Sequence, residues 1–229
     1  MISLESFSII IIEKMRLTLL LVLINVGVFA YTFLNLPYFI ENYGISSSSV
    51  IEGKYINIVT AMFIHNGILH LLGNMLVLFF VGKTIEKHTN SITYLAVYFL
   101  SGILPNLSIS LFNFIVGDII AVGASAAISG LIGFGAFKLS GKWILSPIRF
   151  IPIPMPFILA GALYTFLNLA GVFVIKENIN IAAGAHLFGG VIGALFGLVG
   201  EQHKLRKIVI FFLLIAFISL LPYLLRYLF

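Results

Sequence analysis

The sequence predicts an all-α, polytopic membrane protein that forms a single integral-membrane domain over residues 1–229. The composition favours this class, because 61% of the residues are hydrophobic and only 9% are charged, whereas about a quarter of a soluble domain is charged. The apolar residues gather in runs of about 20, the length at which a helix crosses a bilayer. The basic residues lie mainly between these runs, as topology signals do.

The apolar runs are the predicted spans. They lie near residues 15–36, 68–83, 91–115, 121–140, 155–175, 183–200 and 207–228. The first run is too long for a removable signal peptide and lacks a clear small-residue cleavage site. Little chain remains between the runs, so we expect no separate soluble domain.

Cysteine content and charge exclude several other classes. The chain has no cysteine, which excludes disulfides, thiolate metal sites and a cysteine nucleophile. A net charge of +5 indicates a nucleic-acid partner only when the charge is clustered on a soluble surface. Here the basic residues are scattered between apolar runs, so we expect no nucleic-acid partner.

The basic residues also predict the orientation. With the N-terminus in the cytoplasm, the basic residues of the inner loops far outnumber those of the outer loops, which is the positive-inside bias. We expect an odd number of spans, a C-terminus outside, and a location in the cell membrane of a prokaryote. The inner residues are Lys14, Arg16, Lys83, Lys87, Lys138, Lys142, Arg149, Lys204, Arg206 and Lys207, and the outer residues are Lys54, Lys176 and Arg226.

The second span is predicted to begin with a polar pair. His70 and Asn74 are four residues apart, so they share one helical face, and both can donate hydrogen bonds. Acyl transfer builds negative charge on a carbonyl oxygen, which fixed donors stabilise. One interpretation is an oxyanion site formed by Asn74, His70 and the backbone N–H of Ser125. The other is that a buried Asn or His only ties helices together.

The fourth and sixth spans are predicted to begin with Ser125 and His186, on the same outer side as His70 and Asn74. A hydroxyl and an imidazole are costly at membrane depth, so their presence there needs a reason. A serine nucleophile paired with a histidine base supplies that reason.

Small residues follow both candidates at helical spacing and would let the two helices approach closely. Packing these stripes together would bring the Ser125 hydroxyl near the His186 ring. Small residues at this spacing more often serve helix packing alone. The presence of Ser125 and His186 at the ends of the two stripes favours a catalytic site. The stripes are Ser129 and Gly133 after Ser125, and Gly189, Gly190, Gly193 and Gly197 after His186.

Three motifs resemble those of the rhomboid family of intramembrane serine proteases, and the resemblance extends from about Gly53 to Gly197. Their common order along the chain makes the signal specific, whereas Gly-x-Ser alone would be weak. The motifs are His65, His70 and Asn74; Gly123-Ala124-Ser125 followed by Ile128, Gly130 and Gly133; and Ala185-His186 with Gly189. Thr60-Ala61-Met62-Phe63 and Glu86 also fit the family.

The resemblance implies a six-helix core over about 15–200, with 207–228 as an extra seventh transmembrane helix. It implies a Ser–His dyad with Ser125 as nucleophile and His186 as base, and an oxyanion hole formed by His70, Asn74 and the Ser125 N–H. No cofactor and no metal are implied. The partners would be transmembrane protein substrates and the lipid bilayer. Structural support is expected from His65, Gly123, Ala126, Glu86, Gly189 and Gly193.

The chain departs from the family pattern at two places. Ala126 stands where the family usually has glycine after the nucleophile, and the extra methyl group is expected to lower activity. Ile56-Asn57, with Tyr55 before them, replace a Trp-Arg pair in the first outer loop. The second change removes an interfacial anchor and an arginine fork, so it affects the placement of that loop.

Rival chemistries find little support in the sequence. No His-Glu-x-x-His zinc motif is present, and Asp118 is the only aspartate, which excludes an aspartyl dyad. We interpret Asp118 as a solvated loop residue rather than as a third catalytic group. Two alternatives remain: an inactive rhomboid-fold protein that binds membrane clients, and a small transporter or channel. A transporter or channel would need ionisable residues along a path through the core, and spans one, five and seven have almost none.

Four prolines lie between the fourth and fifth spans. We expect them to break the helix and to form a fixed inner loop, and a hinge for substrate entry is the less favoured interpretation. They are Pro147, Pro152, Pro154 and Pro156.

Overall fold

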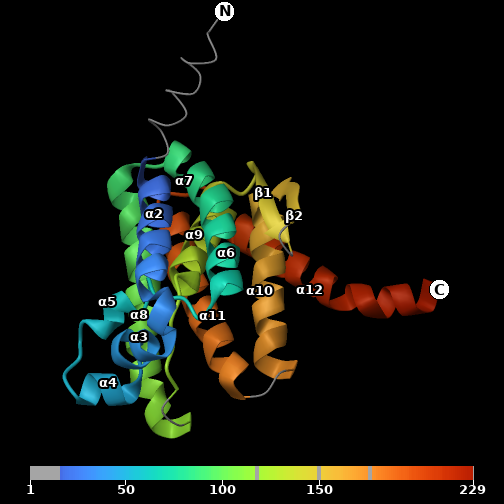
Figure 1. The fold of residues 1–229 in the computed structure, drawn as a ribbon. Coiled ribbons are helices and arrows are strands. Elements are labelled where there is room, and N and C mark those ends of the chain that lie inside the picture. Colours follow the sequence, from blue (N-terminus) through green and yellow to red (C-terminus); the bar gives the residue numbers. More distant parts are fainter. Residues whose placement is uncertain (1–15, 117–118, 149–150, 175–176, 229) are drawn as a thin grey trace, which may run out of the picture.

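A computed structural model describes residues 16–116, 119–148, 151–174 and 177–228 of the chain. The predicted class is confirmed: each predicted apolar run forms a helix, and all of these helices except the last pack side by side into a bundle (Figure 1). Lys14, Asp118, Arg149 and Lys176, which the sequence analysis named, lie outside the described residues.

Most of the described chain is helical. The elements in order are α2 (Arg16–Thr32), η1 (Phe33–Asn35), α3 (Leu36–Tyr43), α4 (Ser47–Ile51), α5 (Asn57–Thr60), α6 (Ile68–Val77), the π-helical turn η2 (Leu78–Gly82), α7 (Lys83–His88), α8 (Ser91–Val116), α9 (Ser125–Lys138), β1 (Trp143–Ile148), β2 (Ile151–Pro156), α10 (Phe157–Val174), α11 (Glu177–Leu198) and α12 (Lys204–Leu228). Among the described residues, Arg16–Tyr43, Ile68–His88 and Ser91–Ile109 are long and apolar enough to cross a membrane.

Helix α9 forms the centre of the bundle, between α8, α10 and α11 (Figure 1). Its small residues let α11 approach closely, because there is no room for a side chain between the two backbones. A Cβ atom added at Gly193 would overlap the Gly130 carbonyl oxygen, and one at Gly133 would overlap the carbonyl oxygen of Gly190. The two helices are therefore held in one register by backbone contact.

The bundle has two ends, which we name the α4 end and the α7 end after the short helices there (Figure 1). At the α7 end, the Glu86 carboxylate accepts hydrogen bonds from the Leu17 and Thr18 N–H groups at 2.7 and 2.9 Å, and from Thr18 Oγ1. It thereby satisfies backbone donors at the start of α2 that have no acceptor within that helix. Glu86 thus joins α7 to the start of α2, which is consistent with the structural role expected for it.

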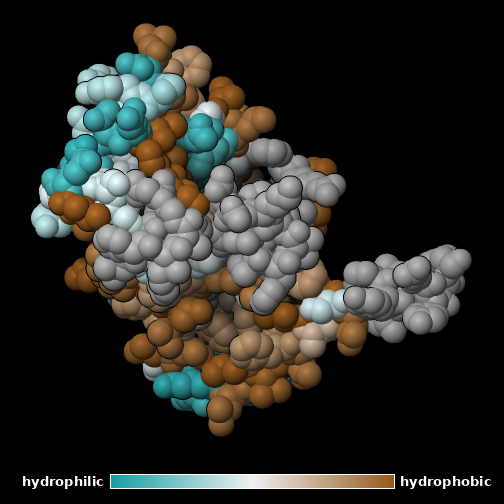
Figure 2. Space-filling view, turned by 90° about the horizontal axis from the view of Figure 1, so that it is seen from below, coloured by the Kyte–Doolittle hydropathy of each residue, from teal (hydrophilic) through white to brown (hydrophobic). Residues whose placement is uncertain are grey.

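At the α4 end the surface is divided. Figure 2, which views this end face-on, shows hydrophilic side chains gathered in one area, while most of the remaining coloured surface is hydrophobic. The segment from α3 to α5 carries charged residues such as Glu52 and Lys54, which form a salt bridge of 2.8 Å. A polar cap beside a broad apolar surface is the pattern of a chain that lies partly in lipid.

The segment between α9 and α10, predicted as a fixed inner loop, is a two-stranded antiparallel hairpin at the α7 end. All four prolines of the predicted loop lie in its two strands. The hairpin contacts η2 and α10 through β1, and α10 through β2.

Helix α12 points away from the bundle rather than running alongside the other long helices (Figure 1). An ionic cluster holds its start: Glu201 forms salt bridges with Lys207 and, at 3.1 Å, with Lys138 of α9. These lysines lower the pKa of Glu201, the hydrogen bond from Lys207 being the largest cause. The role of 207–228 as a seventh span stays a prediction.

Candidate active site

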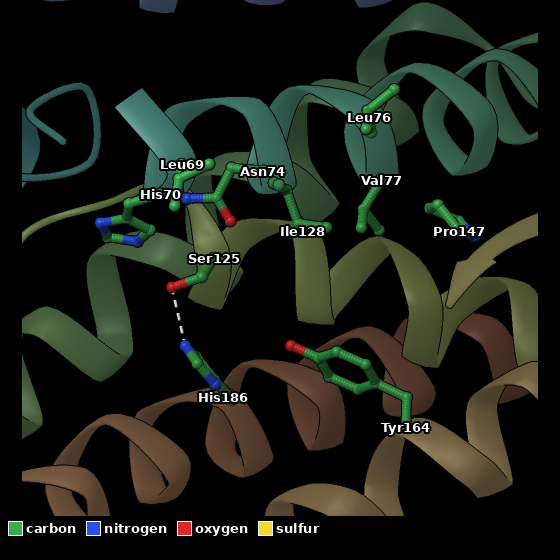
Figure 3. Close-up of a pocket in the computed structure, with 11 residues that line it drawn as sticks. Leu69, His70, Asn74, Leu76, Val77, Ser125, Ile128, Pro147, Tyr164 and His186 are labelled. Carbon is green, nitrogen blue, oxygen red and sulfur yellow. Dashed lines mark hydrogen bonds between the residues drawn. The ribbon is translucent and has the colours of Figure 1, made fainter. Parts of the chain in front are cut away.

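Ser125 and His186 contact each other directly. The Ser125 Oγ atom lies 2.7 Å from His186 Nε2 (Figure 3). Ser125 is the first residue of α9, whereas His186 lies well inside α11, which begins at Glu177. The sequence predicted that His186 would lie at the start of its span. The position differs because α11 begins several residues before the apolar run does.

The structure adds Asn168 of α10 to this pair, a residue that the sequence analysis missed. Its Oδ1 atom lies 2.9 Å from His186 Nδ1. An amide oxygen only accepts hydrogen bonds, so the imidazole donates its Nδ1–H to Asn168. The unprotonated Nε2 then faces the serine hydroxyl, which is the tautomer required of a general base.

A tyrosine one turn before Asn168 closes the same side of the site. The Tyr164 ring centroid lies 6.5 Å from that of His186, and its hydroxyl lies 2.8 Å from Ser129 Oγ. Ser129 also donates to the Ser125 carbonyl oxygen at 2.6 Å. The Ser129 side chain therefore contacts α10. The neighbouring glycines Gly130 and Gly133 are the residues of α9 that allow the close approach to α11.

The opposite wall is formed by His70 and Asn74 of α6, which lie above Ser125 in Figure 3. The Asn66 N–H donates to His70 Nδ1 at 3.3 Å, so the ring proton resides on Nε2 and is available as a donor. Within the described part of the chain, Asn74 Nδ2 is a buried donor with no hydrogen-bond partner. A buried unsatisfied N–H group is costly, and a ligand oxygen would relieve that cost.

Gly123 lets this wall approach the start of α9. Its φ is +120°, in the region that favours glycine, and a Cβ atom there would lie 2.8 Å from His70 Cε1. Its N–H donates to the Ala61 carbonyl oxygen at 2.8 Å, which ties the two loops together. The N–H of Ser125, as the first of its helix, has no acceptor within α9.

These side chains line a cavity of about 350 Å³. Its remaining walls are apolar and come from α6, α9 and the hairpin; they include Leu69, Val77, Ile128 and Pro147. A nucleophile, its base and the candidate oxyanion donors thus surround one space, and within the described residues one of these donors, Asn74 Nδ2, has no hydrogen-bond partner. Such an arrangement can carry out acyl transfer at a carbonyl carbon.

His65 lies behind this wall rather than in the cavity. Its side chain is fully buried, and its ring centroid lies 5.1 Å from that of His70. Burial, together with the nearby His70 ring, lowers the pKa of His65 from 6.5 to about 4. The residue is therefore neutral at physiological pH and supports His70 by packing.

The first loop is held by a residue from the predicted departure. Asn57 is buried and donates to the Asn42 and Gly44 carbonyl oxygens at 3.0 and 2.8 Å, while Ile56 is exposed. Two backbone hydrogen bonds thus fix the loop without an arginine.

At the departure after the nucleophile, Ala126 is buried and its carbonyl oxygen lies against Gly189 of α11. A Cβ atom at Gly189 would overlap that oxygen, so the glycine makes room for the Ala126 backbone. The effect of Ala126 on activity stays a prediction.

Comparison with known proteins gives consistent matches. The model of the rhomboid domain family matches residues 52–203. The chain is 34% identical over 142 residues to "RHOMBOID-like protein 1" of Arabidopsis thaliana, covering 61% of this chain and 33% of that protein. It is 29% identical over 158 residues to "Putative rhomboid protease YdcA" of Bacillus subtilis (strain 168), covering 69% of this chain and 73% of that protein.

A third relative carries a different description. The chain is 35% identical over 103 residues to "Inactive RHOMBOID-like protein 8" of Arabidopsis thaliana, covering 44% of this chain and 28% of that protein. The chain thus spans about a third of the length of these two plant relatives.

Proposed function

Because this chain belongs to the rhomboid family, we propose that it is an intramembrane serine endopeptidase that hydrolyses peptide bonds in or near transmembrane segments of other proteins. The observation that carries the proposal is the 2.7 Å contact between Ser125 Oγ and His186 Nε2 at the wall of a cavity that His70 and Asn74 also line. A hydrogen-bonded serine and neutral histidine are the parts that nucleophilic catalysis needs.

In the proposed reaction, His186 Nε2 takes the Ser125 proton while Oγ attacks the scissile carbonyl carbon. The oxyanion accepts hydrogen bonds from Asn74 Nδ2, His70 Nε2–H and the Ser125 N–H. His186 then gives its proton to the leaving amine. A water molecule, activated by the same histidine, hydrolyses the acyl-enzyme and regenerates the serine.

Asn168 is a positioning residue in this proposal. Its amide oxygen holds the Nδ1–H of His186 and so fixes the ring tautomer and orientation. This is the role that a carboxylate has in the Ser-His-Asp arrangement. A neutral partner keeps the buried site free of an unpaired charge, which would be costly at membrane depth.

The chain is an integral, multi-pass membrane protein, and we propose the orientation that its basic residues predict. The α7 end, with Lys83 and Lys87, would then face the cytoplasm, and the α4 end would face outward. The site would open toward the outer side, where water for the hydrolytic step is available.

The direct test is cleavage of a model transmembrane substrate by the purified protein in proteoliposomes. Ser125→Ala and His186→Ala are expected to lose nearly all activity, because residual catalysis without the pair is small. Asn74→Ala is expected to lower kcat by about 10²-fold as a lost oxyanion donor. Ser219→Ala, a change on α12 far from the site, is the matched control and should cleave normally.

An inactive client-binding protein is the second candidate, favoured by the inactive plant relative and by Ala126. A fluorophosphonate probe separates the two candidates. Labelling of the wild-type protein that disappears in both Ser125→Ala and His186→Ala supports the protease. A wild-type protein that binds a transmembrane segment but neither labels nor cleaves would establish the alternative.

A further inference from the structure

The β1–β2 hairpin has several exposed apolar side chains. Trp143 is 67% exposed and Ile151 is 64% exposed, and Leu145 and Ile153 are exposed as well. On the protein side, Ile144 and Met155 are buried in the core of the bundle. Exposed apolar side chains gathered on one small element mark a contact surface.

Strand β1 lies beside a helical segment that is long and apolar enough to cross a membrane. Strand β1 packs against η2, which forms the middle of the candidate span Ile68–His88. At about 1.5 Å per residue, η2 begins about 15 Å from the start of that span. A hydrocarbon core is about 30 Å thick, so η2 and the strand beside it fall within the half of the core nearer the α7 end.

Strand β1 packs against η2, whereas the outer edge of β2 is free of any other described strand. A free strand edge is a liability in hydrocarbon, because unpaired N–H groups find no acceptor there. The register shows how β2 avoids this. The Phe157 N–H donates to the Lys142 carbonyl oxygen. In an antiparallel pair, every second residue of a strand directs its N–H toward the partner strand. Counting back from Phe157, residues 155, 153 and 151 of β2 therefore direct their N–H groups toward β1. The N–H positions of β2 that face away from β1 are then 152, 154 and 156.

Each of these outward positions is a proline. Proline has no N–H, so the outer edge of β2 carries no backbone donor. The carbonyl groups that remain tolerate incomplete hydrogen bonding better than N–H groups do. The proline spacing thus matches the chemistry of a strand edge in hydrocarbon, and it explains prolines that a water-exposed turn would not need at alternate positions.

We propose that the hairpin is a lipid-embedded element, with the donor-free edge of β2 and the side chains of Trp143, Leu145, Ile151 and Ile153 in contact with acyl chains of the leaflet at the α7 end. A strand of another protein is a poor occupant of this edge, because strand pairing requires alternating N–H and C=O groups on both partners. The edge of β2 offers acceptors only.

The chain has one tryptophan, and it lies in this hairpin, which permits a direct test. The wild-type protein is reconstituted in nanodiscs of phosphatidylcholine, with or without bromine atoms in the middle of the acyl chains. Trp143 emission should have a blue-shifted maximum, should lose intensity in brominated nanodiscs, and should resist aqueous acrylamide. Quenching by acrylamide alone would place the hairpin in water, and protection from both quenchers would mean that protein covers it; either result overturns the proposal.

Two reporters in a Trp143→Phe background sharpen the test. Ile153→Trp on β2 should be quenched by brominated lipid, whereas Lys54→Trp at the polar α4 end should be quenched by acrylamide. If Ile153→Trp behaves like Lys54→Trp, the proposed lipid contact of β2 is wrong.

The edge itself is tested by Pro154→Ala, which introduces an outward N–H without a partner in the hairpin. In hydrocarbon, hydrogen–deuterium exchange at that amide should be slow because water is absent. Exchange at the rate of an unstructured amide would show a water-exposed edge and would overturn the proposal. The amide of Ile153, which the register directs toward β1, serves as the internal reference.

Discussion

At the scale of single residues, the site combines two kinds of polar group that membrane helices rarely contain. Asn168 and His186 satisfy each other, so they are stable in the resting protein. Asn74 Nδ2, by contrast, is buried and has no hydrogen-bond partner among the residues that the structure describes. The contact between Asn168 and His186 fixes the orientation of the imidazole. The unpaired Asn74 donor raises the free energy of the resting site, and a hydrogen bond to the developing oxyanion removes that penalty.

The positioning role of Asn168 predicts a specific order among its variants. Asn168→Leu removes the acceptor for His186 Nδ1–H at similar volume and should lower kcat by about 10- to 100-fold with KM nearly unchanged, less than the roughly 10⁴-fold loss caused by a wrong tautomer. Asn168→Asp keeps an acceptor, and the imidazolium that forms at His186 during the reaction would pair with its charge, so this variant should retain more activity than Asn168→Leu. Steady-state kinetics in proteoliposomes measures both. Equal losses in the two variants would indicate that Asn168 only fills space.

His65 predicts a pH dependence of stability. Its pKa is lowered to about 4 by burial in the folded protein, against an ordinary value of 6.5. Between these values the unfolded chain binds more protons than the folded protein, so stability falls as the pH drops from 6.5 toward 4 and is independent of this residue above that window. Thermal unfolding in detergent, recorded across this range, should show a shallower pH slope for His65→Gln than for the wild-type protein.

At the scale of elements, the contact of α9 with α11 determines whether the catalytic pair can form. The sequence predicted this contact correctly in kind, because small residues at four-residue spacing allow close helix approach. It predicted the partners only in part: Gly133 and Gly190 of the two stripes lie against each other, but Gly130 rather than Ser129 lies against Gly193. Ser129 and Gly130 lie on neighbouring faces of α9. Which of the two faces contacts α11 depends on how each helix is rotated about its axis in the bundle, and the sequence does not show that rotation.

Two glycines of α11 test this contact. Gly193→Ala places a Cβ atom on the Gly130 carbonyl oxygen and should destabilise the protein by about 1–3 kcal/mol, the usual cost of overpacking, with loss of activity. Gly184→Ala is the matched control, since its Cβ would have no neighbour within 4 Å. That change should be neutral or stabilising by up to about 1 kcal/mol. Similar unfolding temperatures for both variants would contradict the packing argument.

The misses at this scale also have physical causes. Asn168 escaped notice because it is a single polar residue in an apolar run, and its partner comes from another helix. An intramembrane polar residue is by itself a reason to look for a site. The hairpin escaped notice because strands rich in proline lack the usual alternation of apolar and polar residues. Only the strand register reveals that those prolines share one edge.

At the scale of the whole molecule, the sequence predicted the class and the positions of the helices well, because lipid demands long apolar helices. It predicted less about their arrangement. The first loop is held by Asn57, and α12 leaves the bundle, neither of which hydropathy encodes. The walls of the cavity come from α6, α9, α10, α11 and the hairpin, so the site exists only in the assembled bundle.

This architecture predicts which substrates are cut fastest. A transmembrane helix hides its carbonyl groups in backbone hydrogen bonds, so a segment must unwind before Ser125 can attack. Glycine in place of a good helix former lowers that cost by about 1 kcal/mol, and since about 1.4 kcal/mol is tenfold in rate, one glycine beside the scissile bond should speed cleavage by about fivefold.

Paired substrates with Leu or Gly at that position, measured in proteoliposomes, give the comparison. The same pair presented as unstructured soluble peptides is the control, because no helix has to unwind there and the preference should vanish. Equal cleavage of both membrane substrates would contradict the unwinding step, whereas a glycine preference that persists in the soluble peptides would assign it to binding in the cavity.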